Sequence, residues 1–159
     1  MTDHITWLTP AAHNRLTEEL EERQGPIRDE ITKRIALARE EGDLKENGGY
    51  HAAREEQGKN EARITHLAHL LEHARVGTPE VPDGEAHIGR VVTVEFATDE
   101  QESYYIGSSE ERGSSEHEVL SPTSPLGAAL IGHRIGDEVS YKLPNGREIT
   151  VVLVDVQSH

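Results

Sequence analysis

Apolar residues in the first half of the chain recur at spacings of three and four positions. This spacing places them on one face of an α-helix and is typical of a coiled-coil seam. The first run contains Leu16, Leu20, Ile27, Ile31 and Ala38, and the second contains Tyr50, Ala53, Ile64, Leu67, Leu71 and Ala74. Thr9 followed by Pro10 is a favourable helix start, with Thr9 as the N-cap. The pattern therefore predicts two helices before residue 78.

The two runs fit together as an antiparallel hairpin. The register that keeps facing positions matched pairs Leu16 with Ala74, Leu20 with Leu71, Gln24 with Leu67, Ile27 with Ile64, Ile31 with Asn60 and Ala38 with Ala53. This register places the turn near residues 45 and 46. Asn60 then either lies in the seam, where a polar residue fixes the register at some cost in stability, or points to solvent.

Gly25 and Pro26 interrupt the first helix. Proline lacks an N–H group and clashes with the preceding helical turn, so we expect a kink or break at this point. The apolar seam resumes at Ile27.

After residue 88, apolar residues alternate with polar ones, as they do in β-strands. Strand-like runs cover residues 89–96, 102–107, 117–121, 137–143 and 147–156. Asn145-Gly146 predicts a hairpin turn between the last two runs. Residues 124–132 predict a short helix that begins at Ser124-Pro125, and the serine- and glutamate-rich residues 107–116 predict a mobile loop.

These patterns predict an α+β protein. An N-terminal antiparallel α-helical coiled-coil hairpin covers residues 1–78, and a linker containing proline and glycine covers residues 79–88. An antiparallel β domain with one short helix then covers residues 89–159.

The composition excludes several classes of function and binding site. The 159 residues include 16 lysines and arginines against 30 aspartates and glutamates, so the formal net charge is -14. A chain this acidic does not bind nucleic acid through its overall field, and any such role needs a local site or a partner protein. There is no cysteine, which excludes disulfides and thiolate metal sites. We find no signal peptide and no apolar run long enough to span a membrane, and we expect a cytoplasmic protein.

The predicted turn gathers acidic residues, with Glu40, Glu41, Asp43 and Glu46 around Lys45. Asp43 and Glu46 are close enough in sequence to share one ion, and Mg²⁺ is commonly bound through one or two carboxylates. Two carboxylates alone hold Mg²⁺ weakly, so the remaining oxygens would come from another protein or a phosphate. The alternative is that the cluster is only a solvated surface.

The turn sequence resembles a known signature. Residues 39–58, REEGDLKENGGYHAAREEQG, are similar to the hairpin-tip motif of the Gre family of bacterial transcript-cleavage factors, roughly G-D-L-x-E-N-x-x-Y-x-x-A-R-E. Residues 121–139, SPTSPLGAALIGHRIGDEV, resemble the second motif of the family. The resemblance covers essentially the whole chain.

The resemblance implies a transcription elongation factor that is not itself an enzyme. Its coiled coil would enter the secondary channel of bacterial RNA polymerase. Asp43 and Glu46 match the acids that help to hold a second Mg²⁺, which is shared with the polymerase active site and is not tightly bound by the free protein. The polymerase would then cut backtracked nascent RNA and leave a new 3′ end. Arg39, Lys45 and Arg54 flank the acids and are candidates for contacting the RNA.

The resemblance also implies that the C-terminal domain is FKBP-like and docks on the rim of the channel. Thr123, Ser124 and Pro125 match the rim-contact loop, and we expect the factor to act as a monomer. Many relatives carry an alanine and an acid in place of Gly48 and Gly49, so we expect a looser tip here.

Three other functions compete with this interpretation. A paralogue that blocks the channel without stimulating cleavage would not need the geometry of Asp43 and Glu46. Prolyl isomerase activity needs a pocket rich in aromatic residues, and the C-terminal half offers few. His66, His69 and His73 have the spacing of one helix face, so they are either a Zn²⁺ or Ni²⁺ site or ordinary helix surface.

Overall fold

The computed structural model describes residues 5–43, 45–112 and 116–158. The chain forms two compact units. One unit spans His13–Ala74, and the other combines Arg75–His159 with the chain up to Ala12.

This division differs from the predicted boundaries at residues 78 and 88. Strand β1 (Trp7–Leu8) pairs in parallel with strand β2 (Arg75–Val76), so the start of the chain folds with the C-terminal unit. The segment expected to be a linker also packs into this unit, because Ala86 is fully buried. The Arg90 guanidinium donates hydrogen bonds to main-chain carbonyls of the same segment, those of Val81, Pro82 and Glu85.

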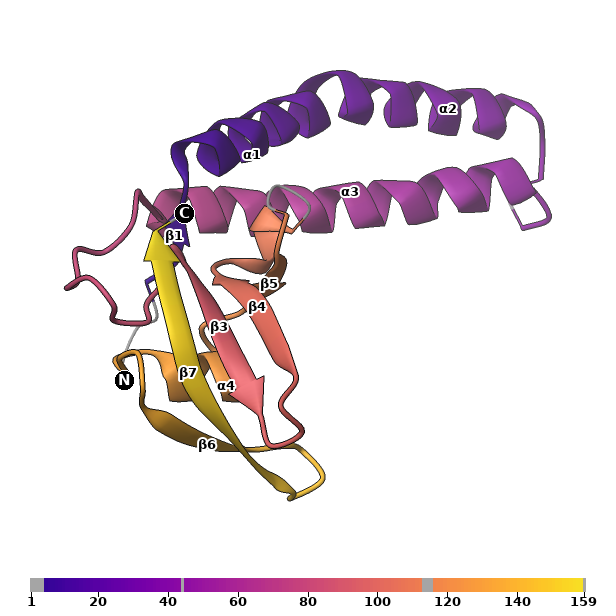
Figure 1. Ribbon diagram of the computed structural model, residues 1–159. Coiled ribbons are helices and arrows are strands. Elements are labelled where there is room, and N and C mark those ends of the chain that lie inside the picture. Colours follow the sequence, from indigo (N-terminus) through magenta and orange to yellow (C-terminus); the bar gives the residue numbers. More distant parts are fainter. Residues whose placement is uncertain (1–4, 44, 113–115, 159) are drawn as a thin grey trace. The chain divides into compact units, whose positions relative to one another are not determined.

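The hairpin unit is helical on both sides of its turn (Figure 1). Its first side consists of α1 (Pro10–Glu22), the π-helical turn η1 (Arg23–Ile27) and α2 (Arg28–Glu40). Its second side is one helix, α3 (Gly48–His73). The predicted N-cap is confirmed, since the Thr9 hydroxyl oxygen accepts a hydrogen bond from the Ala12 amide at 3.1 Å.

The chain stays helical through Gly25 and Pro26, so the expected break does not occur, although the first side of the hairpin changes direction between α1 and α2 (Figure 1). The wider π-helical turn accommodates a proline that cannot donate a hydrogen bond. The turn also changes the phase of the helix, so Gln24 is exposed and the predicted pairing of Gln24 with Leu67 is wrong. Asn60 is buried in the hairpin, as one of the two alternatives required. Its side chain forms hydrogen bonds with Arg23.

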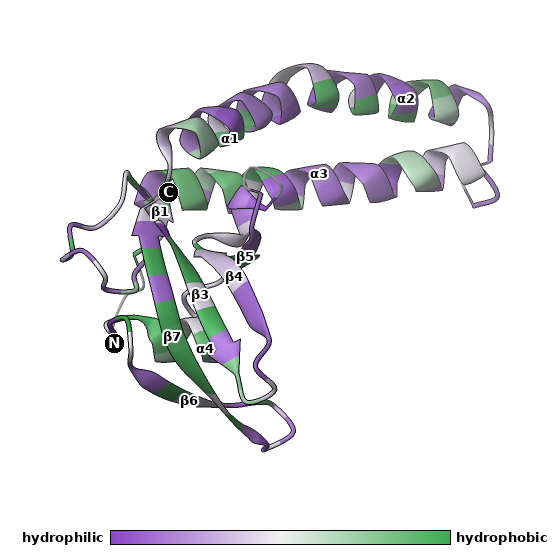
Figure 2. Cartoon of the chain, viewed as in Figure 1, coloured by the Kyte–Doolittle hydropathy of each residue, from purple (hydrophilic) through white to green (hydrophobic). Residues whose placement is uncertain are grey.

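Beyond the π-helical turn the predicted seam positions Ile31, Ala38 and Ala53 are buried, and Ile35, which was not among the predicted positions, is buried with them. Ile31, Ile35 and Ala53 form a buried cluster with Ile27 and Tyr50 packed against it. Ion pairs tie the two sides together, and they join Arg28 to Glu61, Arg34 to Glu56 and Arg63 to Glu19. Hydrophilic residues cover most of the remaining helix surface (Figure 2).

The second unit contains a five-stranded sheet with the strand order β5-β4-β3-β7-β6. The strands are β3 (Arg90–Phe96), β4 (Gln101–Ile106), β5 (Glu118–Leu120), β6 (Glu138–Lys142) and β7 (Glu148–Ser158). Only the β4–β5 pair is parallel within this sheet, so the predicted α+β class with a mainly antiparallel sheet is confirmed.

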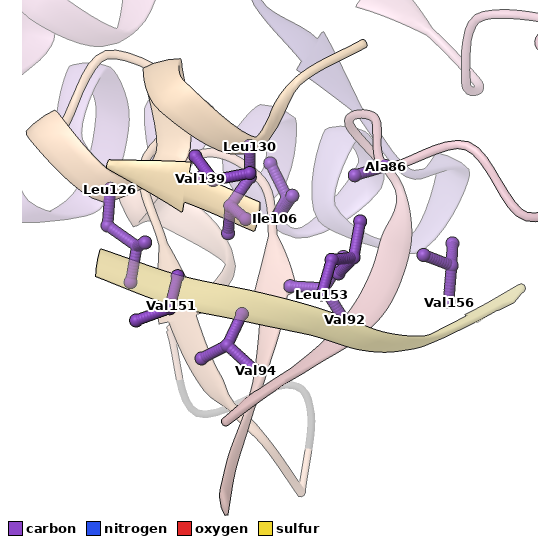
Figure 3. Packing of buried hydrophobic residues seen from close by; sticks show 10 residues of the cluster. All are labelled: Ala86, Val92, Val94, Ile106, Leu126, Leu130, Val139, Val151, Leu153 and Val156. Carbon is purple, nitrogen blue, oxygen red and sulfur yellow. The ribbon is translucent and has the colours of Figure 1, made fainter. Parts of the chain in front are cut away.

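The core of this unit lies between the sheet and helix α4 (Pro125–Leu130). Alternate residues of the two central strands point inward, among them Val92 and Val94 on β3 and Val151 and Leu153 on β7. Leu126 and Leu130 of α4 extend toward them (Figure 3). The expected helix start is confirmed, because the Ser124 hydroxyl oxygen accepts a hydrogen bond from the Gly127 amide.

Part of the segment expected to be a mobile loop is packed. Ser109–Glu111 form a short 3-10 helix, η2, and Glu111 is only 2% exposed. The Thr9 amide donates a hydrogen bond to Glu111 Oε1 at 3.1 Å. Burial, followed by the Glu111 charge, raises the pKa of the Tyr105 hydroxyl to about 12. The Glu111 carboxylate therefore holds this segment against Thr9, the residue before helix α1. Residues 113–115 lie outside the described chain.

No helix within the described residues is both long and apolar enough to cross a membrane.

Candidate functional site

The acidic residues lie in the turn of the hairpin, between Glu40 and Gly48, which we call the tip loop. Helix α2 ends at Glu40, and the Glu41 amide donates the last capping hydrogen bond to the Ala38 carbonyl at 3.2 Å. Gly42 follows with a φ of 125°, a left-handed conformation that glycine adopts without strain. The chain can therefore reverse direction directly after the helix.

Asp43 and Glu46 are both exposed in this loop, as their predicted role requires. Asp43 Oδ1 accepts a hydrogen bond from the Lys45 amide at 3.0 Å, and this bond holds Asp43 and Lys45 in a tight local turn. Leu44 lies outside the described residues. Both carboxylates are thus presented to solvent on the surface of the hairpin end.

Asn47 joins the two helices at the base of the tip loop. Its Oδ1 atom accepts a hydrogen bond from the Tyr50 amide at 3.1 Å and caps helix α3. Its Nδ2 atom donates to the Ala38 carbonyl at the end of α2, at 2.6 Å. His51 Nε2 lies 3.3 Å from the Lys45 carbonyl oxygen, one turn further along. Helix α3 begins at Gly48 despite the two glycines, since Asn47 supplies the cap.

The three basic residues predicted to contact RNA differ in the contacts that their side chains make. The Arg39 guanidinium carbon lies 5.9 Å from the centre of the Tyr50 ring, within the range of a cation–π contact. Arg54 Nη1 donates to Gln57 Oε1 at 2.6 Å on the surface of α3. The Lys45 side chain is exposed in the loop itself. Contact with RNA remains a prediction for each of them.

The donor atoms of the tip fit part of a magnesium site. Within residues 5–43, 45–112 and 116–158, no group of three or more histidine, cysteine, aspartate or glutamate side chains is placed to hold a metal ion. Asp43 and Glu46 supply two hard carboxylate groups, the number that Mg²⁺ commonly takes from protein. The chemistry of these residues therefore suits a shared site that needs oxygens from elsewhere.

The same observation bears on His66, His69 and His73, because these three side chains do not form such a group in the described structure. The rings of His69 and His73 are 4.2 Å apart between centres, and His73 Nδ1 contacts the His69 carbonyl at 2.8 Å.

The predicted docking residues stand at the start of helix α4. Thr123 and Pro125 are exposed. The Ser124 hydroxyl donates to the Ser121 carbonyl at 2.6 Å and also caps the helix, so this side chain shapes the turn from within. A partner molecule would therefore meet Thr123 and Pro125 first.

A cavity of about 620 Å³ adjoins the docking residues, and the sequence did not reveal it. Its walls include Trp7 from β1, Ile88, Ile131, Pro122 and Thr123. These residues come from four separate segments of the chain. Trp7 was not among the predicted site residues, although a lone tryptophan in a chain poor in aromatic residues was the available signal.

Comparisons with known proteins agree with the two-part organisation. Residues 6–76 match the family described as "Transcription elongation factor, N-terminal", and residues 81–158 match "Transcription elongation factor, GreA/GreB, C-term". The transcription elongation factor GreA of Streptomyces coelicolor is 48% identical over 159 residues, covering 99% of this chain and 96% of that protein. The GreA protein of Mycobacterium tuberculosis is 45% identical over 165 residues, covering 100% of this chain and 99% of that protein.

A solved structure is also similar. The crystal structure of GreA factor homolog 1 of Thermus thermophilus is 31% identical, with a TM-score of 0.44, and the match covers 98% of this chain and 100% of that one. Both family matches together span most of the chain, and the resemblance stated from the tip motif is confirmed. The chain belongs to the GreA/GreB family of transcription elongation factors.

Proposed function

We propose that this elongation factor stimulates bacterial RNA polymerase to cleave backtracked nascent RNA, and so rescues arrested complexes. The observation that carries the proposal is the pair of exposed carboxylates, Asp43 and Glu46, in the turn of a long helical hairpin. Helix α3 has 26 residues and is therefore about 39 Å long. A rod of this length can carry its tip into the deep secondary channel of the polymerase.

In this proposal the tip supplies ligands and orientation rather than a complete active site. Asp43 and Glu46 would hold a second Mg²⁺ shared with the polymerase, and that ion would supply the activation of water for attack on a phosphodiester. Their carboxylates also accept hydrogen bonds and can orient that water. Lys45, Arg39 and Arg54 offer positive charge to the phosphates of the displaced RNA 3′ end.

The C-terminal unit acts as the anchor in this proposal. Thr123 and Pro125 contact the rim of the channel, and Ser124 holds their turn in shape. An anchor of this kind raises the effective concentration of the tip in the channel to about the millimolar range. The factor works as a monomer in the cytoplasm, and the polymerase performs the cleavage.

The cleavage assay on a backtracked complex tests this function. We expect RNA in a stalled bacterial elongation complex to be shortened from its 3′ end much faster with the protein than without it, and to be extended again on addition of nucleotides. The alternative, a factor that only occupies the channel, predicts slower nucleotide addition with no gain in cleavage. That result would overturn the proposal.

A further inference from the structure

We propose that Asn47 is a positioning residue that fixes the tip loop, and with it Asp43 and Glu46, in the arrangement needed for cleavage stimulation. This inference rests on the proposed function. It concerns a side chain that contacts neither RNA nor metal in the proposed mechanism.

The two ends of the tip loop meet on one atom. The Ala38 carbonyl oxygen accepts the Glu41 amide at 3.2 Å, where the loop leaves α2. The same oxygen accepts Asn47 Nδ2 at 2.6 Å, where the loop enters α3. A carbonyl oxygen has two lone pairs, so it can serve both donors at once. The loop is thereby closed at its base.

Only a side chain with both a donor and an acceptor can make this closure. Asn47 Oδ1 accepts the Tyr50 amide and caps α3, while Nδ2 reaches the end of the opposite helix. Serine caps a helix about as well as asparagine but has a shorter side chain with a single oxygen. Aspartate keeps the cap, but its ionised carboxylate at neutral pH only accepts hydrogen bonds and has no donor for the Ala38 carbonyl.

The carboxylates depend on this closure because their own anchoring is local. Asp43 Oδ1 is bonded to the Lys45 amide, which belongs to the same loop. The Lys45 carbonyl oxygen lies 3.3 Å from Nε2 of His51, whose side chain is exposed to solvent. Asn47 is half-buried, and Ala38 is buried beneath it. A rigid base thus limits how far the loop can move.

The decisive variant is Asn47→Ser, which keeps a helix cap and removes the bond to Ala38. We expect the concentration of protein needed for half-maximal cleavage to stay the same, because the docking residues are untouched. The cleavage rate at saturation should fall about tenfold or more, since misplacing a catalytic group by about 1 Å can cost roughly 100-fold. Asn14→Ser, on the exposed surface of α1, is the matched control and should change neither quantity.

A second measurement follows the loop in the free protein. In ¹⁵N relaxation experiments, the amides of Gly42, Lys45 and Glu46 should become more mobile in Asn47→Ser than in the wild type. Asp43→Asn keeps the Oδ1 acceptor, so it should lower the cleavage rate while these amides stay ordered.

The two measurements separate the possible failures. Unchanged loop relaxation or an unchanged saturating rate in Asn47→Ser overturns the role of Asn47, even if the wild type stimulates cleavage. A wild type that stimulates no cleavage overturns the proposed function instead, and the relaxation data then still decide whether Asn47 holds the loop.

Discussion

The side-chain amide of Asn60 is bonded to both the main chain and the side chain of Arg23. Asn60 Nδ2 donates to the Arg23 carbonyl at 3.1 Å, and Arg23 Nη1 donates to Asn60 Oδ1 at 3.1 Å. Arg23 is the first residue of the π-helical turn that contains Pro26. The buried Asn60 of α3 thus donates a hydrogen bond to a main-chain carbonyl of the opposite side of the hairpin, at the point where the π-helical turn interrupts the regular α-helical hydrogen bonds of that side.

Asn60→Ala should destabilise the protein by about 1–3 kcal/mol, the cost of leaving a buried polar group without its partner. Urea unfolding followed by circular dichroism measures this free energy. Asn14→Ala is the control, because Asn14 is exposed and should change the stability by no more than about 0.5 kcal/mol. Equal stabilities for the two variants would contradict the role of Asn60.

Gly58→Ala should stabilise the protein by about 0.5–1 kcal/mol. Gly58 lies inside α3, where alanine restricts the unfolded chain and favours the helix. A Cβ atom added at this position meets no heavy atom within 4 Å. Thermal unfolding should show a higher midpoint for this variant.

The matched comparison is Gly107→Ala. A Cβ atom there would lie 2.5 Å from Tyr105 Cε1 and 2.6 Å from Glu111 Oε2, so this variant should unfold at a lower temperature. A stabilising effect of Gly107→Ala, or a destabilising effect of Gly58→Ala, would contradict the packing described around these two glycines.

Glu19 should make the stability depend on acid pH. Hydrogen bonds from Arg63 and, to a lesser degree, from Arg23 lower the pKa of Glu19 from its usual 4.5 to about 2, although burial acts in the opposite direction. Because the folded-state pKa is the lower one, the stabilisation is complete above about pH 4.5 and is lost as the pH falls toward 2.

Unfolding free energies of the wild type and Glu19→Gln, measured from pH 6 to pH 2, test this contribution. The wild type should lose about 1–2 kcal/mol more than the variant, a value reduced from the full pKa shift because the carboxylate is partly exposed. Parallel pH profiles for the two proteins would exclude the Glu19 contribution.

Replacing residues 13–74 with a short glycine–serine linker should leave a folded docking unit. The strands β1 and β2 and the Thr9–Glu111 hydrogen bond remain in this variant, whereas a fragment that starts at residue 85 would lack the buried Leu8. We expect it to compete with the full chain for polymerase and to stimulate no cleavage. Trp7 fluorescence reports whether it is folded, and cleavage activity in this variant would contradict the division of roles.

The sequence predicted the parts of the fold that depend on local patterns. The seam positions Ile31, Ala53 and Leu67 are buried as their spacing indicated, because a helix face is set by residues three or four positions apart. The predicted seam position of Gln24 was wrong because the apolar spacing does not reveal the π-helical turn, which changes the helical phase of α1 relative to α2.

The features that the sequence did not predict depend on contacts between distant residues. The pairing of Trp7 with Arg75 and the bond of Thr9 to the buried Glu111 join segments far apart in the chain. The acidic tip was found because its carboxylates are unusually dense. The bond of Asn47 to Ala38 was not, since it requires the two helix ends to be brought together first.

The central claim is that Asp43 and Glu46 carry the chemistry of the tip, and the saturating rate of RNA cleavage by polymerase tests it most directly. Asp43→Asn and Glu46→Gln preserve shape and remove charge. Each should lower the rate roughly 10–100-fold while the affinity for polymerase, measured by competition, stays the same. Glu72→Gln, an exposed acid elsewhere on α3, should cleave like the wild type. Wild-type rates for either tip variant at limiting Mg²⁺ would contradict the account.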